Sequence, residues 1–523
     1  MTNRVVVTGG LLVDGTGAPG QIGDVLVEDD KIVGVGSGIG AVADAKVIDA
    51  EGKVVSPGFI DLHTHADYSI LAFPTADSAL RQGITTIAVG NCGGGVAPIS
   101  EAHDIRPVAF AFRPEWGVDV TWRSFPEYLE LLSGLGTNVA AMVPHGALRN
   151  SVMGVRPRPA SPDELEAMQQ RLEEALQSGA VGMSTGLQYR PGCWAPRSEI
   201  RQLVEVVGNH SGIYASHMRD RSESYVAAIE EALDAVAETG AHLQLSHVVA
   251  RPNAPSEEIE RGLAAMSGTT HDRFAVDTFP EPWGPGLLID LFPDELMEGD
   301  TATVLARLTD ARARSEMEAY IDAGSSFLAR VAGYEEIYLS WVPDRPDLNG
   351  FPIAQAPSVG SFCCDVLIEA GERLREVGIR HIYADTSRLD EVLRLPYCIV
   401  ASDGIVTTGE DDACDILWSA STYGYTARLL EHYVRETGSL SLEDAVHRMT
   451  QLPAEALGLT NRGSLTVGKQ ADLVVFDPDS IHDRSTPTEM ARHPAGIDLV
   501  LVNGSIAVDE FGVTDAGAGL LAV

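Results

Sequence analysis

The middle of the chain repeats one pattern: a short apolar run of strand type is followed by an amphipathic segment of helical type. Such alternation is typical of repeated βα units and a parallel sheet. Eight runs can be placed in order: VSPGFIDLHTH, ITTIAVGNC, NVAAMVPHG, AVGMSTGL, GIYASHM, HLQLSHV, FAVDTFP and YCIVASDG. Because eight such strands close a (β/α)8 barrel, the sequence predicts an α/β fold of the TIM-barrel type.

The two ends of the chain have a different hydrophobic pattern from the middle. Both carry short alternating runs broken by Gly, Asp and Asn, which is typical of hairpins and meanders. We therefore expect both termini to build one small β-sandwich domain. The gap between the seventh and eighth runs is too long for a single loop, so we expect an insertion there that covers the rim of the barrel. The predicted boundaries are 1–56 and 458–523 for the small domain, 57–457 for the barrel and about 284–350 for the insertion.

Composition limits the class of protein. The chain has 523 residues, 45% of them hydrophobic, which is enough for a large core. Its net charge of −38 makes nucleic acid and anionic membranes unsuitable partners. No run approaches the roughly 20 apolar residues of a membrane-spanning helix, the start lacks a secretory signal, and the six cysteines lack disulfide spacing. We expect a cytoplasmic enzyme, and the sequence leaves open whether it is a homo-oligomer.

Six residues with metal-binding side chains lie at the ends of the predicted strands: His63, His65, Cys92, His217, His247 and Asp403. Strand ends of one polarity form the catalytic face of a barrel. In His63-Thr64-His65, alternate residues of a strand point the same way, so two imidazoles can bind one metal ion from one side. An isolated HxH motif is weak evidence, but its coincidence with ligand types on four further strands predicts a metal site.

Several segments resemble the amidohydrolase superfamily, and most closely its D-aminoacylases, the N-acyl-D-amino-acid deacylases. The matching segments are VVSPGFIDLHTHAD, GITTIAVGNCG, GAVGMSTGLQY, ASHMRD, LQLSHV, ASDG and GSLTVGKQADLVVFDP. The resemblance runs from about residue 1 to 510. It implies a hydrolase that cleaves a carbon–nitrogen bond in an amide or cyclic amide by means of metal-activated water, with a small-molecule substrate.

The resemblance also implies roles for the six residues. Cys92, His217 and His247 would hold one tightly bound zinc ion, while His63, His65 and Asp403 would surround a second, weaker divalent metal position. Asp403 would in addition be the general base. Turn capping by Asp403 and simple burial of Cys92 are the structural alternatives.

The four lysines lend independent support to a metal-binding cysteine. Many members of the superfamily bridge two metals with a carboxylated lysine from a barrel strand. None of the four lysines of this chain lies in the predicted barrel. Since zinc readily takes sulfur ligands, the Cys92 thiolate is the expected bridging donor.

The sequence departs from the deacylase pattern at the positions that hold the substrate carboxylate. A lysine is usual two residues after the sixth-strand histidine, but Val249 stands there, and the expected HPR-type segment after the eighth strand reads SASTYG. We therefore expect a substrate other than an ordinary N-acyl-D-amino acid, such as a neutral or basic amide. Acidic side chains after the seventh and eighth strands would suit a cation, with solvated loop carboxylates as the alternative: Glu281, Glu410, Asp411 and Asp412.

Other residues are candidates for substrate binding by their positions at strand ends. His145, Gln188 and Tyr189 follow the third and fourth strands, and Glu281 follows the seventh. Arg219, Arg221 and Arg251 follow the fifth and sixth strands and would restore anion binding from new positions.

Three alternatives to a hydrolase of neutral or basic amides therefore stay open. The first is a genuine N-acyl-D-amino-acid deacylase with relocated carboxylate-binding residues. The second is a non-hydrolytic metal-dependent lyase or isomerase, and the third is an inactive binding protein on the same scaffold.

Overall fold

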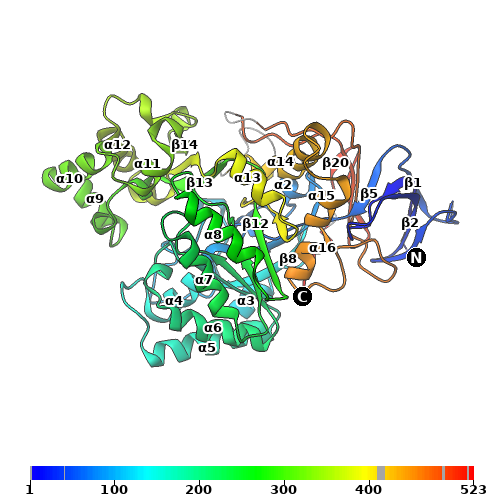
Figure 1. Cartoon of the computed structure of the whole chain (residues 1–523), viewed down its shortest axis with the longest axis horizontal. Helices are drawn as coiled ribbons and strands as arrows, with labels where there is room; N and C mark the ends of the chain where they lie inside the picture. Colours follow the sequence, from blue (N-terminus) through cyan, green and yellow to red (C-terminus); the bar gives the residue numbers. More distant parts are fainter. Residues whose placement is uncertain (1–2, 41, 409–418, 486–488, 515–516) are drawn as a thin grey trace.

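The computed structural model describes residues 3–40, 42–408, 419–485, 489–514 and 517–523. At its centre lies an eight-stranded parallel sheet with the strand order β16-β12-β11-β10-β9-β8-β7-β6 (Figure 1). The strands are β6 (Phe59–Asp61), β7 (Ile84–Val89), β8 (Asn138–Pro144), β9 (Gly182–Gly186), β10 (Ile213–His217), β11 (His242–Leu245), β12 (Phe274–Thr278) and β16 (Cys398–Val400). A parallel bridge between Thr64 and Gly404 joins the two outer strands beyond their ends. The predicted barrel is confirmed, and each of the eight predicted runs contains one of its strands.

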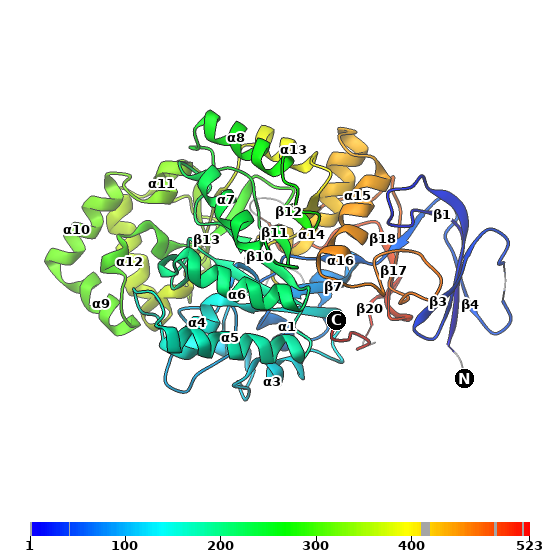
Figure 2. The same ribbon diagram turned by 60° about the horizontal axis from the view of Figure 1, so that its bottom comes forward.

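Helices follow the strands and cover the outside of the barrel (Figure 2). They are α1 (Ser69–Ala72), α2 (Asp77–Leu80), α3 (Phe125–Leu129), α4 (His145–Met153), α5 (Pro162–Gln177), α6 (Arg197–Asn209), α7 (Tyr225–Val236), α8 (Ser256–Ser267), α13 (Thr386–Leu393), α14 (Ser421–Arg428), the π-helical continuation Leu429–Glu436, α15 (Leu442–Arg448) and α16 (Gln451–Ala456). Among the described residues, three short 3-10 turns lie between these helices: Asn91–Gly93, Pro114–Trp116 and Gly192–Trp194. No helix in the described ranges combines the length and apolarity needed to cross a bilayer.

Helix α5 shows how local sequence sets an element. Ser161 caps its first turn by accepting a hydrogen bond from the Glu164 backbone N–H, and the Glu164 side chain returns one to the Ser161 backbone. Pro162 is the first helical residue, and Gly179, with φ at 108°, follows the last turn. These capping residues account for where the helix begins and ends.

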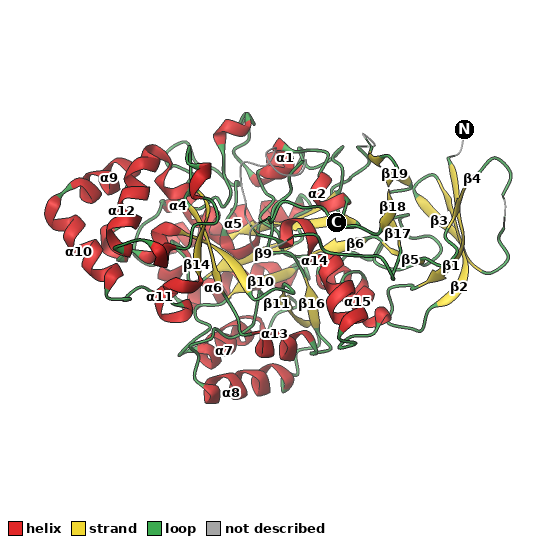
Figure 3. Ribbon diagram, turned by 90° about the horizontal axis from the view of Figure 1, so that it is seen from above, coloured by secondary structure: helices red, strands yellow, loops and turns green. Residues whose placement is uncertain are grey.

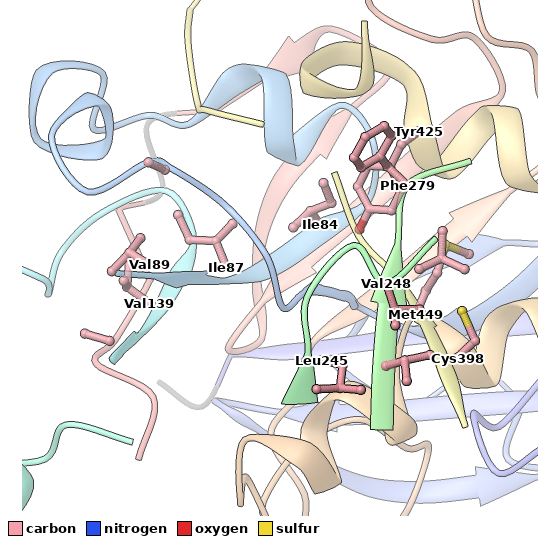
Figure 4. Packing of buried hydrophobic residues seen from close by; sticks show 14 of the residues in the cluster. Ile84, Ile87, Val89, Val139, Leu245, Val248, Phe279, Cys398, Tyr425 and Met449 are labelled. Carbon is pink, nitrogen blue, oxygen red and sulfur yellow. The ribbon is translucent and has the colours of Figure 1, made fainter. Parts of the chain in front are cut away.

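The barrel has one apolar layer inside the sheet and another between the sheet and its helices. Along β8, Ala140 and Met142 belong to the inner cluster, while Val139, Ala141 and Val143 belong to the outer one. This period of two follows from the alternation of side chains along a strand. Figure 4 shows part of the outer layer, with β7 side chains such as Ile84, Ile87 and Val89.

An insertion between β12 and β16 forms a separate unit at one end of the molecule (Figure 3). A three-stranded antiparallel sheet of order β13-β15-β14 carries helices and short turns, and 21 buried apolar residues form its own core. Since β15 lies in the middle of that sheet, the inserted segment extends to residue 382, beyond the expected boundary near 350. Its elements are β13 (Trp283–Leu287), the 3-10 turns Leu288–Leu291, Asp294–Leu296, Tyr334–Glu336, Pro346–Leu348, Ile353–Gln355 and Gly371–Glu376, helices α9 (Thr301–Thr309), α10 (Ala311–Asp322), α11 (Phe327–Ala332) and α12 (Val359–Ala370), and strands β14 (Ile337–Trp341) and β15 (Gly378–Ile382).

Both termini build one nine-stranded sheet at the opposite end of the molecule from the insertion (Figure 1). Strand β17 pairs with β5 in antiparallel register, so residues from the two ends of the chain share main-chain hydrogen bonds. The strands are β1 (Arg4–Leu12), β2 (Gln21–Glu28), β3 (Lys31–Gly36), β4 (Lys46–Asp49), β5 (Val54–Pro57), β17 (Leu473–Phe476), β18 (Ile497–Val502), β19 (Ser505–Asp509) and β20 (Gly512–Val513).

Candidate metal centre

All six predicted ligands come together at the carboxyl ends of the barrel strands. His63 and His65 follow β6, Cys92 follows β7, His217 ends β10, His247 follows β11 and Asp403 follows β16. Each is at most 8% exposed. Buried, chemically compatible donors from five strands are an arrangement that folding alone would not favour, because burying polar groups costs free energy.

His63 stands at the centre of the cluster. Its Nε2 lies 3.3 Å from the Cys92 Sγ and 3.4 Å from the Asp403 Oδ1. The Cys92 Sγ also lies 3.3 Å from the His247 Nε2. His63, Cys92 and His247 therefore form one group whose donor atoms all lie within 4.8 Å of one another.

A second donor group adjoins the first. The His65 Nε2 lies 3.0 Å from the Asp403 Oδ1, and His63, His65 and Asp403 also lie within 4.8 Å of one another. His63 belongs to both groups, which suits two adjacent metal positions.

His217 reaches the cluster through His247. Its Nδ1 is 2.9 Å from the His247 Nε2, and its Nε2 is 3.0 Å from the Gln188 Oε1. The resemblance placed His217 with Cys92 and His247, whereas the closest trio here includes His63 instead. The role of His217 as a ligand stays a prediction.

Asp277, at the end of β12, contacts two of the candidate ligands, His63 and His247. Its Oδ1 lies 3.2 Å from the His63 Nδ1 and accepts a hydrogen bond from the His247 backbone N–H, and Gln244 donates to its Oδ2. A carboxylate on Nδ1 leaves Nε2 of His63 directed at the metal position. Our sequence prediction did not assign this residue to the site, although the strand-end rule that selected the six ligands also applies to it.

The backbone of three predicted ligands is strained. Cys92, His247 and Asp403 have φ values of 51°, 32° and 50°, a left-handed region that non-glycine residues seldom adopt. Asn91 stabilises the turn at Cys92 by donating from its amide to the Leu62, Thr64 and Ala88 carbonyls. Such strain concentrates at functional sites, where the surrounding structure enforces it.

The electrostatic environment separates the donors into two kinds. Burial lowers the pKa of His217 and His247 well below its usual value, and Arg221 lowers it further, so both imidazoles are neutral. Burial also opposes protonation of His63 and His65, but the anions around them outweigh it and raise the pKa of both.

The thiol and the carboxylate of the cluster favour their charged forms. Burial raises the pKa of the Cys92 thiol, but His63 and His65 outweigh this and bring the pKa below its usual value. The same two histidines hold the pKa of Asp403 below its usual value against the effect of burial. A thiolate, a carboxylate and imidazoles form the donor set that zinc prefers, so the residues fit a metal ion.

Gln188 and Tyr189 lie beside the cluster, as expected from their position after β9. Besides the Gln188 contact, the Tyr189 ring stands 4.3 Å from the His217 ring, measured between centroids. The Phe110 ring bridges Tyr189 and His65, at 5.6 and 4.9 Å. Phe110 is a neighbour of the site that no sequence motif indicated.

Of the three arginines after β10 and β11, Arg221 contacts the metal cluster and Arg251 contacts Arg221. Arg221 donates from Nη1 to the His247 carbonyl at 2.6 Å, and the Arg251 backbone N–H donates to the Arg221 carbonyl. Burial and the nearby Arg221 lower the pKa of Arg251 to about 9. Arg219 instead makes a two-pronged ion pair with Glu231, on the outer helix α7.

The other two candidate residues have partners of their own. The His145 Nε2 lies 3.0 Å from the Glu199 Oε1, which also pairs with Arg149, so His145, the first residue of α4, belongs to a buried ion cluster. Glu281 accepts a hydrogen bond from Ser421 and lines a separate small pocket with Arg380 and Arg428. Glu410, Asp411 and Asp412 lie outside the described residues.

Comparison with known proteins agrees with this geometry. The profile named Amidohydrolase family matches residues 46–282 and 399–508. The chain belongs to the amidohydrolase family. The unmatched stretch between the two parts corresponds to the insertion.

Two curated relatives match nearly the whole chain. A D-aminoacylase of Alcaligenes xylosoxydans xylosoxydans is 33% identical, covering 98% of this chain and 96% of its own length. An N-acyl-D-glutamate deacylase of the same organism is 32% identical, covering 96% and 92%. This amidohydrolase is accordingly a metal-dependent hydrolase that acts on carbon–nitrogen bonds other than peptide bonds.

Solved structures lead to the same group. A crystal structure of D-aminoacylase superposes with a TM-score of 0.82 at 30% identity over 99% of both chains. An N-acyl-D-glutamate deacylase of Bordetella bronchiseptica, solved with zinc and a phosphonate inhibitor, gives 0.81 at 30% identity over the full length of both. An L-hydantoinase of Arthrobacter aurescens, 18% identical with a TM-score of 0.56, shares the fold alone.

Proposed function

We propose that this amidohydrolase hydrolyses the amide bond of an N-acylated amine that carries an anionic group, and that its resident metal is zinc. The convergence of the six buried donors at one end of the barrel carries the proposal. The zinc-bound deacylase of similar fold supports it. Zinc, when bound, would be held by His63, His65, Cys92, His217, His247 and Asp403, one ion tightly and a second more weakly.

The bound metal would supply water activated for attack at neutral pH and polarisation of the amide carbonyl. The protein's own contribution is to hold the donors in place before binding. Asp277 orients His63, and the hydrogen bonds of Asn91 fix the turn that presents Cys92. Donors held in advance lose little conformational freedom when the metal binds.

Asp403 would move the proton. Its carboxylate is ionised because His63 and His65 lower its pKa, so it can accept a proton from the attacking water. The same carboxylate can then protonate the leaving nitrogen. Its contact with His65 Nε2 holds it at the centre of the site.

Arg221 and Arg251 support an anionic substrate over the neutral or basic amide that the sequence favours. Both guanidinium groups are buried and act on the histidines of the cluster. Arg221 has no carboxylate within ion-pair distance among the described residues, and its Nε–H has no hydrogen-bond acceptor there. A buried cation without a counter-ion is costly, so a substrate anion would satisfy it. Each charge-assisted contact is worth about 1.5–3 kcal/mol.

A set of matched substrates tests the preference for an anionic substrate. N-acetyl-D-methionine and N-acetyl-D-glutamate are compared with their neutral amides and with a basic N-acetyl diamine, using zinc-loaded enzyme. We expect the carboxylates to be preferred, and an Arg221→Met variant to lose roughly 10- to 150-fold in kcat/KM on them alone. Arg261→Met, which changes a surface arginine of α8, is the control. Faster hydrolysis of the neutral or basic compounds would restore the sequence-based expectation.

Product labelling tests the reaction class. Hydrolysis in isotopically labelled water places one solvent oxygen in the acid product. A lyase or isomerase on the same scaffold would form a product without that label, and this result would overturn the hydrolase mechanism.

A further inference from the structure

A cavity of about 590 Å³ begins at the metal cluster. At its inner end it is lined by Cys92, Gln188 and Tyr189. Its walls come from the loops after β7, β8 and β9 and from the insertion. Arg221 and Arg251 follow β10 and β11 and are not among the described residues of this lining. The cavity therefore adjoins the metal cluster at a part of the site that neither Arg221 nor Arg251 lines.

Phe110 lies beside His65 and Tyr189 and, with Val108, gives the cavity an apolar part of its wall. Charged side chains also line the cavity, among them Arg190, Glu298 and Arg375. The residue packed against the Phe110 ring is a glycine. A Cβ on Gly94 would come within 2.1 Å of that ring. The ring can pack in this position only because residue 94 has no side chain.

The far wall belongs to the insertion. In the segment after β13, Leu288 and Leu291 are buried in the core of the insertion, whereas Leu287 and Ile289 are half-buried and line the cavity. Arg375 donates from Nη2 to the Met297 and Gly299 carbonyls, which ties the next part of this wall to the rest of the insertion. The wall is thus attached to a packed core and supports a defined shape.

We propose that this cavity is an acyl-chain site, and that the preferred substrates carry a medium-length apolar acyl group instead of acetyl. The proposal rests on the proposed amide hydrolysis and names the part of the substrate that lies opposite the anionic group. Pockets of about 300–1,000 Å³ accommodate ligands of drug size, so an acetyl group would leave most of this cavity unfilled. Phe110, Leu287, Ile289 and Met297 provide the apolar surface that an alkyl chain would cover.

A chain-length series on one amine tests the proposal. Acetyl, butyryl, hexanoyl, octanoyl and decanoyl derivatives of the same D-amino acid are compared by kcat/KM. We expect a rise of up to about threefold to fourfold for each added methylene, because burying one methylene contributes about 0.8 kcal/mol. A profile that is flat, or that falls from acetyl onward, would overturn the acyl-chain site.

Ile289→Trp fills the end of the cavity that is remote from the metal. We expect at least a tenfold loss on the decanoyl substrate with acetyl hydrolysis unchanged. The matched control is Ile22→Trp, because Ile22 is 67% exposed on β2 in the terminal sheet. Equal losses on acetyl and decanoyl substrates, in a folded variant with full metal content, would contradict the assignment. Leu287→Trp serves if Ile289→Trp fails to fold.

A binding measurement keeps this inference separate from the proposed activity. Calorimetric titration of the zinc-loaded protein with decanoate and with acetate reports the cavity without turnover. We expect saturable decanoate binding that Ile289→Trp weakens at least tenfold and Ile22→Trp leaves unchanged. If decanoate binds in this way but no N-acyl compound is hydrolysed, the proposed activity fails and the cavity assignment stands. If acyl compounds are hydrolysed but decanoate binds no better than acetate, only the cavity assignment fails.

Discussion

Buried cysteines in the barrel rim and in the insertion have opposite chemistry. Both Cys92, at the rim, and Cys364, on α12 of the insertion, are at most 3% exposed. Burial raises the pKa of the Cys364 thiol to about 12, whereas the imidazoles around Cys92 reverse the effect of burial and lower its pKa. Burial alone thus keeps a thiol protonated, whereas the imidazoles beside Cys92 favour its thiolate form, the form that binds metals.

The backbone and the packing also distinguish the barrel rim from the insertion. The rim combines left-handed non-glycine residues with converging polar groups, while the insertion is built around 21 buried apolar residues. We infer that the rim carries the chemistry and that the insertion shapes the substrate cavity. Breaking each region in turn should therefore separate metal binding from stability.

Removal of the Cys92 thiolate should have the largest effect. In Cys92→Ala, we expect loss of bound zinc and a fall of activity to background. Groups that only support metal ligands cost 10- to 100-fold in metal affinity when removed, so loss of a ligand should cost at least about 100-fold. Elemental analysis with a deacylation assay measures both. Cys363→Ala, a buried cysteine of the insertion core, is the control and should keep its metal.

Asp403→Asn should separate catalysis from metal binding within the rim. We expect the tightly bound metal to remain, with kcat about 10²- to 10⁴-fold lower, because the variant cannot accept the proton. Kinetics on metal-verified protein measures this. Unchanged kcat would leave Asp403 as a turn-capping residue.

Leu339→Ala should damage the insertion and spare the metal. Leu339 is fully buried in the core of the insertion, so the cavity left behind should cost about 2–5 kcal/mol of its unfolding free energy. Denaturant unfolding and zinc content are measured on the same preparations. Loss of zinc from the folded variant, before denaturant is added, would show that metal binding depends on the packing of the insertion.

Glu281→Gln should have the smallest effect and should depend on pH. Burial raises the pKa of Glu281 to about 7, so the folded protein holds this proton more tightly than the unfolded chain. Ionisation therefore costs stability as pH rises from about 4.5 to above 7. We expect the variant to be more stable by on the order of 2 kcal/mol at pH 8, with no difference near pH 4. Thermal unfolding across this range measures it, and an equal gain at both pH values would contradict the charge explanation.

The barrel and the position of the candidate ligands at its strand ends could be predicted because their signals are local. Alternation of strand and helix patterns located all eight barrel strands, and chemically distinctive side chains stood at the strand ends. The extent of the insertion was less accessible, because β15 is joined to β13 only by pairing across about 90 residues of sequence. Asp277 stands at a strand end like the six candidate ligands, whereas Phe110 carries no local mark of its role.

The sequence by itself determined the α/β barrel, the family and the candidate donors at the strand ends, since side-chain periodicity and strand-end position follow from neighbouring residues. Only the tertiary structure decided which donors touch, that Arg221 and Arg251 lie beside the histidines while Arg219 is held by Glu231, and that the insertion closes a cavity over the site. These depend on the approach of segments far apart in the chain, which pairing and packing define and no local pattern encodes.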